Sequence, residues 1–196
     1  MRNIPDSPWL TPAEQEEARE RLLEYGLLKC SNKRDLPLKS GGATDIYVNL
    51  RDAQNRPKAI KFIADLFENP LRRLGCTRFA EVPDSVSCFA GPLSVQTNLP
   101  YPTIRENPKE GRVAKSSVIG SGNYGETIVM LDDVITDGES KIAPYRECLN
   151  MGLRPETLVV LVDRQQGRRK NFAAEHMRMS VWPRPGKPWN GALTIS

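Results

Sequence analysis

The chain has 196 residues, of which 39% are apolar and 27% charged, a balance typical of a globular protein with enough chain for one large core. Its 28 basic and 24 acidic residues leave a net charge of +4, too small and too dispersed to indicate a nucleic-acid partner. No apolar run approaches the roughly 18 residues of a spanning helix, so a membrane partner is excluded too.

The cysteines and the histidine indicate the compartment and exclude one kind of site. Four cysteines are widely spaced with no C-x-x-C pair, and His176 is the single histidine, so a zinc site is not expected. Scattered thiols suit a reducing compartment. The segment 1–17 turns acidic where a secretory signal has its apolar stretch. We therefore expect a cytoplasmic protein.

Two long helices are predicted in the first half of the chain. Thr11, followed by Pro12 and by Glu14 three residues after the cap, predicts a helix over 12–25. Apolar residues recur at helical spacing over 57–74, which predicts a second helix with one buried face.

Short elements lie around these helices. A turn over 38–42 precedes a short strand over 46–50. The runs 79–82 and 86–89 are predicted as strand pieces on either side of a turn, with a short helix after Gly91.

The second half alternates between strands and helices. A strand is predicted over 102–105, and the Gly-, Ser- and charge-rich segment 106–125 is predicted to be a long mobile loop. Apolar runs over 127–131 and 157–162 are typical of buried strands, and a helix ending at Gly152 lies between them. This order predicts an α/β fold in which helices flank a mostly parallel central sheet.

The segment after the first of these strands carries the clearest chemical pattern. Asp132 and Asp133 follow the strand, Gly138 makes a tight turn, and a helix is predicted to begin near Ser140. Backbone N–H groups at a helix start, with the hydroxyls of Thr136 and Ser140, can hold a phosphate. Ionised carboxylates only accept hydrogen bonds, so they suit the hydroxyls of a ribose diol. The pattern predicts a sugar-phosphate site.

This segment resembles the shared motif of the type I phosphoribosyltransferases, an apolar strand and two acidic residues followed by V-I-T-x-G-x-S. The resemblance implies that the site binds 5-phosphoribosyl 1-diphosphate, with the two aspartates on the ribose hydroxyls and the loop around the 5-phosphate. The residues assigned to this donor are Asp132, Asp133, Val134, Thr136, Asp137, Gly138, Glu139 and Ser140. Asp137 and Glu139 depart from the usual small or neutral residues and would repel a phosphate unless they point to solvent or the helix dipole offsets them.

Three further segments are similar to the orotate phosphoribosyltransferases. Residues 38–51 resemble the L-K-S-G…Y-x-x-L-R segment, 104–111 the R-K-E-x-K-D-x-G loop, and 159–167 the V-L-x-D-R-x-x-G segment. The four motifs stand in the family's order from about residue 36 to about residue 170. The fold expected from this resemblance is the type I phosphoribosyltransferase fold.

The resemblance also assigns roles to side chains. It implies that Lys39 reaches the substrate phosphates, that Tyr47 and Val48 flank the base, and that Arg164 meets the carboxylate of orotate. A guanidinium can bind a carboxylate through two parallel hydrogen bonds, which favours arginine over lysine there. Lys109 would close over the diphosphate and exclude water.

The resemblance further implies a homodimer in which the loop 105–118 acts across the interface, with Arg105 and Lys109 in the neighbouring subunit's site. Lys109, Arg105 and Asp133 are thus the expected catalytic residues. Mg²⁺ is the expected cofactor, held mainly by the substrate's diphosphate and hydroxyls rather than by protein ligands. The loop carries Glu106 and Asn107 where the family has a basic and an acidic residue, and it lacks the histidine that many members carry.

The expected organisation is an N-terminal hood or lid segment over 1–52, a phosphoribosyltransferase core over 53–181 and a Pro/Trp-rich tail over 182–196. The expected activity is transfer of the phosphoribosyl group to orotate, giving orotidine 5′-monophosphate and diphosphate in pyrimidine nucleotide biosynthesis. Two alternatives remain open: transfer to another base, and a non-catalytic homologue that binds the sugar phosphate without efficient chemistry.

Overall fold

The computed structural model describes residues 10–31, 33, 35–37, 43–44, 46–105, 118–135, 138–163 and 178–180. The helical elements are α1 (Pro12–Glu24), α2 (Pro57–Arg73), α3 (Ser87–Thr97) and α4 (Ile142–Asn150), with 3₁₀ turns η1 (Leu50–Asn55) and η2 (Glu139–Lys141). The strands are β1 (Leu28–Cys30), β2 (Leu36–Pro37), β3 (Ala43–Thr44), β4 (Ile46–Val48), β5 (Phe79–Glu81), β6 (Thr103–Ile104), β7 (Val118–Ile119), β8 (Thr127–Ile135), β9 (Arg154–Asp163) and β10 (Arg178–Ser180).

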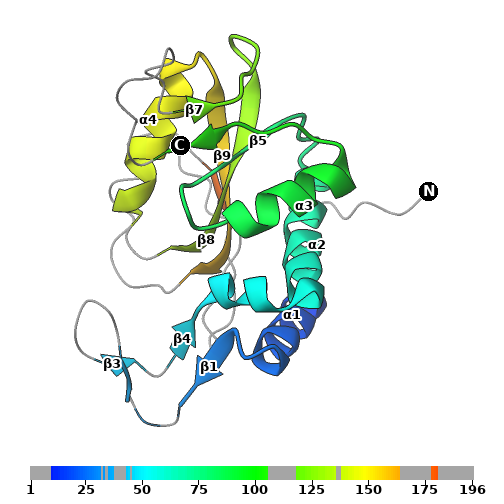
Figure 1. The fold of residues 1–196 in the computed structure, drawn as a ribbon, viewed down its shortest axis with the longest axis vertical. Coiled ribbons are helices and arrows are strands. Elements are labelled where there is room, and N and C mark those ends of the chain that lie inside the picture. Colours follow the sequence, from blue (N-terminus) through cyan, green and yellow to red (C-terminus); the bar gives the residue numbers. More distant parts are fainter. Residues whose placement is uncertain are drawn as a thin grey trace.

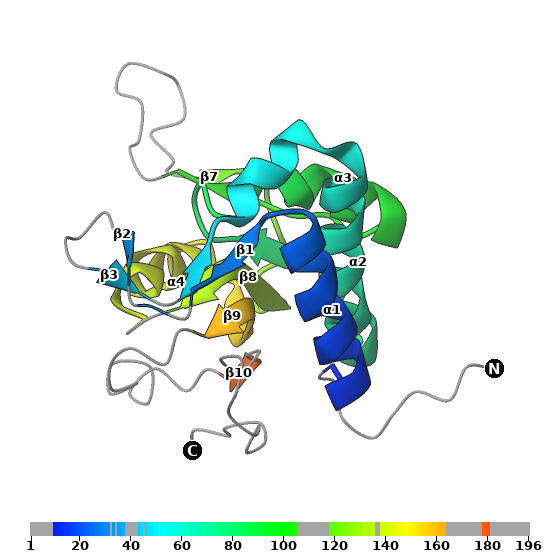
Figure 2. The same ribbon diagram turned by 90° about the horizontal axis from the view of Figure 1, so that it is seen from below.

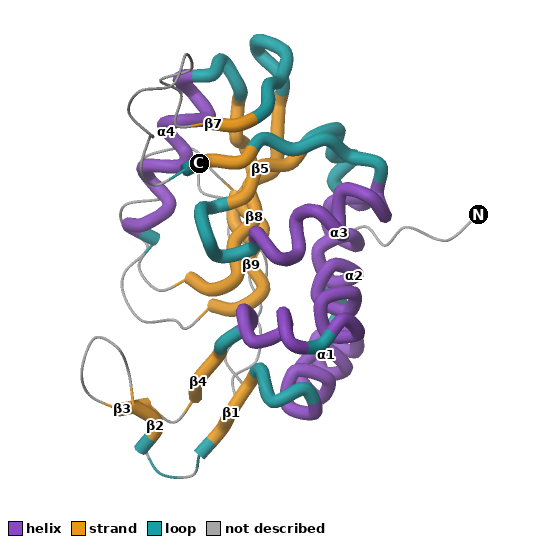
Figure 3. The backbone as a smooth tube through the Cα atoms, viewed as in Figure 1, coloured by secondary structure: helices purple, strands orange, loops and turns teal. Residues whose placement is uncertain are grey.

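A six-stranded sheet in the order β10-β9-β8-β5-β6-β7 forms the centre of the protein. All neighbouring strands run parallel except β7, which is antiparallel to β6. Helices α2 and α3 lie on one side of this sheet and α4 on the other (Figures 1 and 3). The predicted α/β fold with a mostly parallel sheet flanked by helices is confirmed.

Alternation along the central strands explains why both faces are apolar. Successive side chains of a strand point to opposite faces. In β8, Val129 and Leu131 join the core beneath α2 and α3, whereas Ile128 and Met130 join a second core beneath α4. A strand covered on both faces needs apolar residues at every position, which accounts for its continuous apolar sequence.

The N-terminal helix packs into the larger of these two cores. Thr11 and Glu14 form a complete capping box at the start of α1, as the sequence predicts. Ala18 and Leu22 are fully buried in the same core as residues of α2, and Figure 2 shows the two helices side by side. The division of the chain at residue 52 stays a prediction.

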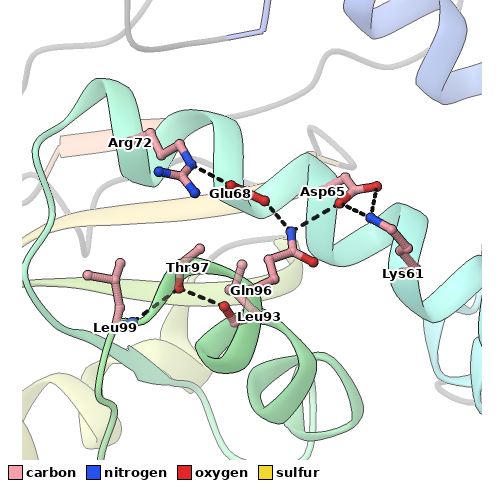
Figure 4. A network of polar contacts seen from close by, with 8 residues as sticks. All are labelled: Lys61, Asp65, Glu68, Arg72, Leu93, Gln96, Thr97 and Leu99. Atoms are coloured by element: carbon pink, nitrogen blue, oxygen red, sulfur yellow. Dashed lines mark hydrogen bonds and ion pairs between the residues drawn. The ribbon is translucent and has the colours of Figure 1, made fainter.

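Polar contacts join α2 to α3 along their exposed rims (Figure 4). Gln96 of α3 donates to Asp65 Oδ1 of α2 over 3.0 Å and also donates to Glu68. Lys61 and Arg72 pair with the same two carboxylates along α2. Helix α3 is therefore fixed to α2 by its rim as well as by its buried face.

The structure corrects four expectations about element boundaries. The run 86–89 is not a strand, because α3 begins at Ser87. Residues 118–119 of the expected long loop form β7. Strand β8 continues past the two aspartates to Ile135, and a 3₁₀ turn precedes α4, which begins at Ile142. Among the described helices, none combines the length and apolarity needed to cross a bilayer.

Candidate functional site

A cavity of about 510 Å³ lies at the carboxyl-terminal edge of the six-stranded sheet. Its wall is formed by η1, the β5–α3 connection, the ends of β6 and β8, and the start of α4. The lining residues are Arg51, Val82, Pro83, Ser85, Ile104, Arg105, Asp133, Ser140, Lys141, Ala143, Pro144 and Glu147. Segments far apart in the sequence thus meet at one hollow.

The topology of the sheet places the cavity there. From β5 the chain passes through α3 to β6, on one side of β5, whereas from β8 it passes through α4 to β9, on the opposite side of β8. Because β5 and β8 are neighbours, their connections diverge between them. Open α/β sheets bind ligands in the crevice at such a point.

Asp133 is the acidic residue of β8 that lines this cavity. Its Oδ1 accepts a hydrogen bond of 2.7 Å from the N–H of Val134. Burial, followed by the charge of Asp132, raises the pKa of Asp133 to about 7, although the Val134 hydrogen bond, Lys141 and Arg51 oppose the shift. A hydroxyl donor at this carboxyl would favour the ionised form and lower the pKa again.

Asp132 has different surroundings from its neighbour. Its side chain is fully buried, and Lys141 Nζ lies 2.5 Å from its Oδ2. Its Oδ1 accepts no hydrogen bond from any described residue. The lysine side chain is 10% exposed and also lines the cavity, so one ammonium group lies between the buried carboxylate and the hollow. In this conformation Asp132 does not itself reach the cavity.

A third carboxyl group, that of Glu81, lies near the same edge at the end of β5. Its side chain is buried and its Oε2 has no partner among the described residues. Burial raises the pKa of Glu81, against the hydrogen bonds made with Thr103 and Ser87. Three carboxyl groups, those of Glu81, Asp132 and Asp133, therefore lie near this end of the sheet. Asp132 forms an ion pair with Lys141.

The predicted phosphate loop is described in part. Gly138 has a φ of +87°, a left-handed conformation that favours glycine, and its carbonyl accepts a hydrogen bond from Lys141 N–H over 3.0 Å. Ser140 lines the cavity, and its role in binding a phosphate stays a prediction. Thr136 and Asp137 lie outside the described residues, and for Glu139 only the backbone, within η2, is described.

The remaining predicted residues are placed unevenly. Arg105 lines the cavity of its own chain, whereas the resemblance assigns it to the neighbouring subunit's site. Tyr47 is half-buried in β4 and is not among the lining residues. Lys39, Lys109 and Arg164 lie outside the described residues. For these residues the assigned roles stay predictions.

Sequence reasoning did not single out two cations of the cavity wall, Arg51 and Lys141. Arg51 ends the Y-x-x-L-R segment, so its position in that motif was an available signal. Lys141 directly precedes α4, where a positive charge opposes the helix dipole. The unfavourable position of Lys141 at a helix start was therefore a signal in the sequence that its charge is balanced by an acidic group, which is Asp132 in the structure.

Comparison with curated proteins identifies several orotate phosphoribosyltransferases as relatives. The orotate phosphoribosyltransferase of Natronomonas pharaonis is 30% identical over 142 residues, covering 72% of this chain and 79% of that protein. The enzyme of the same name from Methanopyrus kandleri is 30% identical over 176 residues, 85% of this chain and 87% of that protein. No family model matches the chain.

Solved structures agree on the fold. The UMP synthase of Leishmania donovani superposes with a TM-score of 0.70 at 25% identity, over 85% of this chain and 35% of that longer chain. The orotate phosphoribosyltransferase of Aeropyrum pernix superposes with a TM-score of 0.64 at 20% identity, over 84% and 92% of the two chains. The predicted phosphoribosyltransferase fold is confirmed.

Proposed function

Because the chain belongs to the orotate phosphoribosyltransferase family, we propose that it transfers the phosphoribosyl group of 5-phosphoribosyl 1-diphosphate to orotate. The bond from the anomeric carbon to diphosphate breaks and a bond to the orotate ring nitrogen forms, which gives orotidine 5′-monophosphate and diphosphate. The supporting observation is the cavity between β5 and β8, whose wall combines the carboxyl of Asp133 with the cations Arg51 and Lys141.

The donor site follows from these charges. Ionised Asp133 accepts hydrogen bonds from the ribose hydroxyls, while the cations attract the phosphoryl groups. As diphosphate leaves, positive charge develops on the ribose and negative charge on the leaving group. Fixed charges of both signs in one partly buried cavity stabilise that separation more strongly than water does.

Mg²⁺ would bind through the substrate rather than in a protein cage. Among the described residues, no group of three or more His, Cys, Asp or Glu side chains is arranged to hold a metal ion. The carboxyl of Asp133 suits hydroxyl donors that in turn coordinate the ion. When bound, Mg²⁺ neutralises part of the diphosphate charge.

The family resemblance supports three further parts of the proposal. Lys109 closes over the diphosphate and excludes water, and it does so across a homodimer interface together with Arg105. Lys39 contacts the phosphates. The protein acts in the cytoplasm, in keeping with its four cysteines, which are free thiols.

The proposed role of Arg164 provides a test of which acceptor the protein uses. A guanidinium paired with the orotate carboxylate makes two charge-assisted hydrogen bonds, so Arg164→Leu should raise the KM for orotate by one to two orders of magnitude. The KM for the donor should change little. If the acceptor lacks a carboxylate, the variant behaves as the wild type, and the acceptor is another base.

The direct test is an assay of the purified protein with orotate, 5-phosphoribosyl 1-diphosphate and Mg²⁺, followed by the loss of orotate absorbance. Uracil and adenine in place of orotate are the matched controls. We expect turnover with orotate and no turnover with uracil or adenine. Calorimetry that shows donor binding with no product from any base would establish the non-catalytic alternative instead.

A further inference from the structure

Lys141 lies between a buried carboxylate and the cavity. Its ammonium group is in contact with the fully buried carboxylate of Asp132, and its side chain lines the cavity. An ammonium has three N–H donors on a flexible stem. A single contact with Asp132 Oδ2 leaves donors of Lys141 available to a ligand in the cavity.

The charges in and after the predicted phosphate loop favour a contact between Lys141 and an anionic ligand. In the sequence, Asp137 and Glu139 are two acidic residues that would repel a phosphate facing them, and Lys141 follows the second of them by two positions. A lysine at the start of α4 is disfavoured by the helix dipole. A dianionic ligand at the same place would reverse that penalty, since it attracts the ammonium group.

Asp132 supplies an independent observation. Its Oδ1 is buried and accepts no hydrogen bond from any described residue. A buried carboxylate oxygen without a donor is unfavourable, so Asp132 depends on its contact with Lys141. Because Asp132 does not reach the cavity, the group of this pair that faces a ligand is the ammonium of Lys141, which has donors for a phosphoryl group.

We propose that Lys141 is a phosphate-binding residue of the donor site and that it neutralises Asp132 at the same time. The inference rests on the proposed function, because 5-phosphoribosyl 1-diphosphate is the ligand that carries both a diol and phosphoryl groups. It assigns to Lys141 a contact with substrate in addition to its contact with Asp132.

The test separates these two contacts by a double-mutant cycle. Lys141→Met is compared with wild type, and the double variant Asp132→Asn/Lys141→Met is compared with Asp132→Asn, in which the buried carboxylate charge is already gone. Affinities for 5-phosphoribosyl 1-diphosphate and for ribose 5-phosphate are measured by calorimetry. Lys61→Met, at an exposed ion pair on α2, is the matched control.

We expect Lys141→Met to weaken donor binding about 10- to 100-fold in both backgrounds, the range of a charge-assisted hydrogen bond. Lys141→Arg should retain most of the affinity. If Lys141 serves only to neutralise Asp132, its replacement in the Asp132→Asn background leaves donor affinity unchanged, and the inference is overturned.

Folding does not block the test. Should Lys141→Met unfold because Asp132 loses its cation, the double variant removes both charges and keeps the comparison. A wild-type protein that does not bind 5-phosphoribosyl 1-diphosphate would overturn the proposed function and this inference together. If wild type binds 5-phosphoribosyl 1-diphosphate, but Asp132→Asn and Asp132→Asn/Lys141→Met bind it with equal affinity, only the inference about Lys141 is overturned.

Discussion

Arg73 and Glu14 connect the last turn of α2 to the first turn of α1, with Arg73 Nη2 donating to Glu14 Oε1 over 2.6 Å. The same carboxylate accepts a hydrogen bond of 2.6 Å from the N–H of Thr11 and so closes the capping box. Partial burial tends to raise the pKa of Glu14, but the hydrogen bonds from Arg73 and Thr11 outweigh it and lower the pKa. One carboxylate therefore serves both a helix cap and a contact between helices.

Glu14→Ala should lower the free energy of unfolding by about 1–2 kcal/mol, because it removes both a cap and an ion pair. Glu14→Gln should lose less, since an amide can still accept from Thr11. A carboxyl with a lowered pKa stabilises the fold above its unfolded pKa, so this loss should disappear as pH falls through the folded pKa. Urea unfolding at pH 7 and pH 3 measures it, with Glu16→Ala as the exposed control.

Asp133→Asn should stabilise the free protein at pH 8. The folded pKa of about 7 lies above the ordinary value of 3.8, so the favourable contribution of Asp133 is present below the unfolded pKa and is lost as pH rises through 7. The variant should gain on the order of 1–3 kcal/mol at pH 8 and almost nothing at pH 4. Asp84→Asn, an exposed carboxylate of the neighbouring connection, is the control; the same gain there would refute a role for burial.

Gly122→Ala should destabilise the protein by about 1–3 kcal/mol, the usual range for overpacking. A Cβ at this position would lie 2.5 Å from the buried Leu153 and 3.2 Å from Arg78 Nε, which is held by an ion pair with Glu126. Gly91→Ala in α3 is the contrast, because its Cβ would meet only the Tyr101 hydroxyl at 3.9 Å. Thermal melting should show a loss for the first variant and no loss, or a small gain, for the second.

Lys109→Ala should reduce kcat by two or more orders of magnitude while the affinity for the donor changes little. The reason is that a lysine closing over the leaving diphosphate acts mainly as charge develops in the transition state. Stopped-flow turnover and donor calorimetry measure the two quantities separately. Lys58→Ala on α2 should leave both unchanged; an equal kcat for Lys109→Ala and wild type would remove this residue from the mechanism.

Local signals in the sequence predicted the long helices well. The capping box at Thr11 and the apolar stripe of α2 depend only on neighbouring residues, and both appear in the structure as predicted. The helix predicted after Gly91 is present, but the start of α3 was wrongly predicted as a strand because its cap residue, Val86, makes no side-chain cap bond, and its apolar residues show no helical stripe. Packing of Phe89 and Leu93 against α2 decides its form instead.

The part of the site that is formed by neighbouring residues in the sequence was predicted, and the part that depends on tertiary contacts was not. The motif around Asp133 and Ser140 is contiguous, so the sequence indicated where it would lie. Arg51 enters the cavity from η1, which only the folded chain brings to β8. The different surroundings of Asp132 and Asp133 likewise depend on which of them Lys141 reaches, and no pattern of spacing contains that information.

The short ladder between β6 and β7 has a consequence for how this protein can vary. Thr103 pairs with Ile119 and Ile104 with Val118, so the two ends of the intervening segment are held side by side by the sheet itself. Loop-closure entropy grows only slowly with loop length. Insertions and deletions between these anchors should therefore be tolerated thermodynamically, which would allow natural or designed variants to retune catalysis there without redesigning the scaffold.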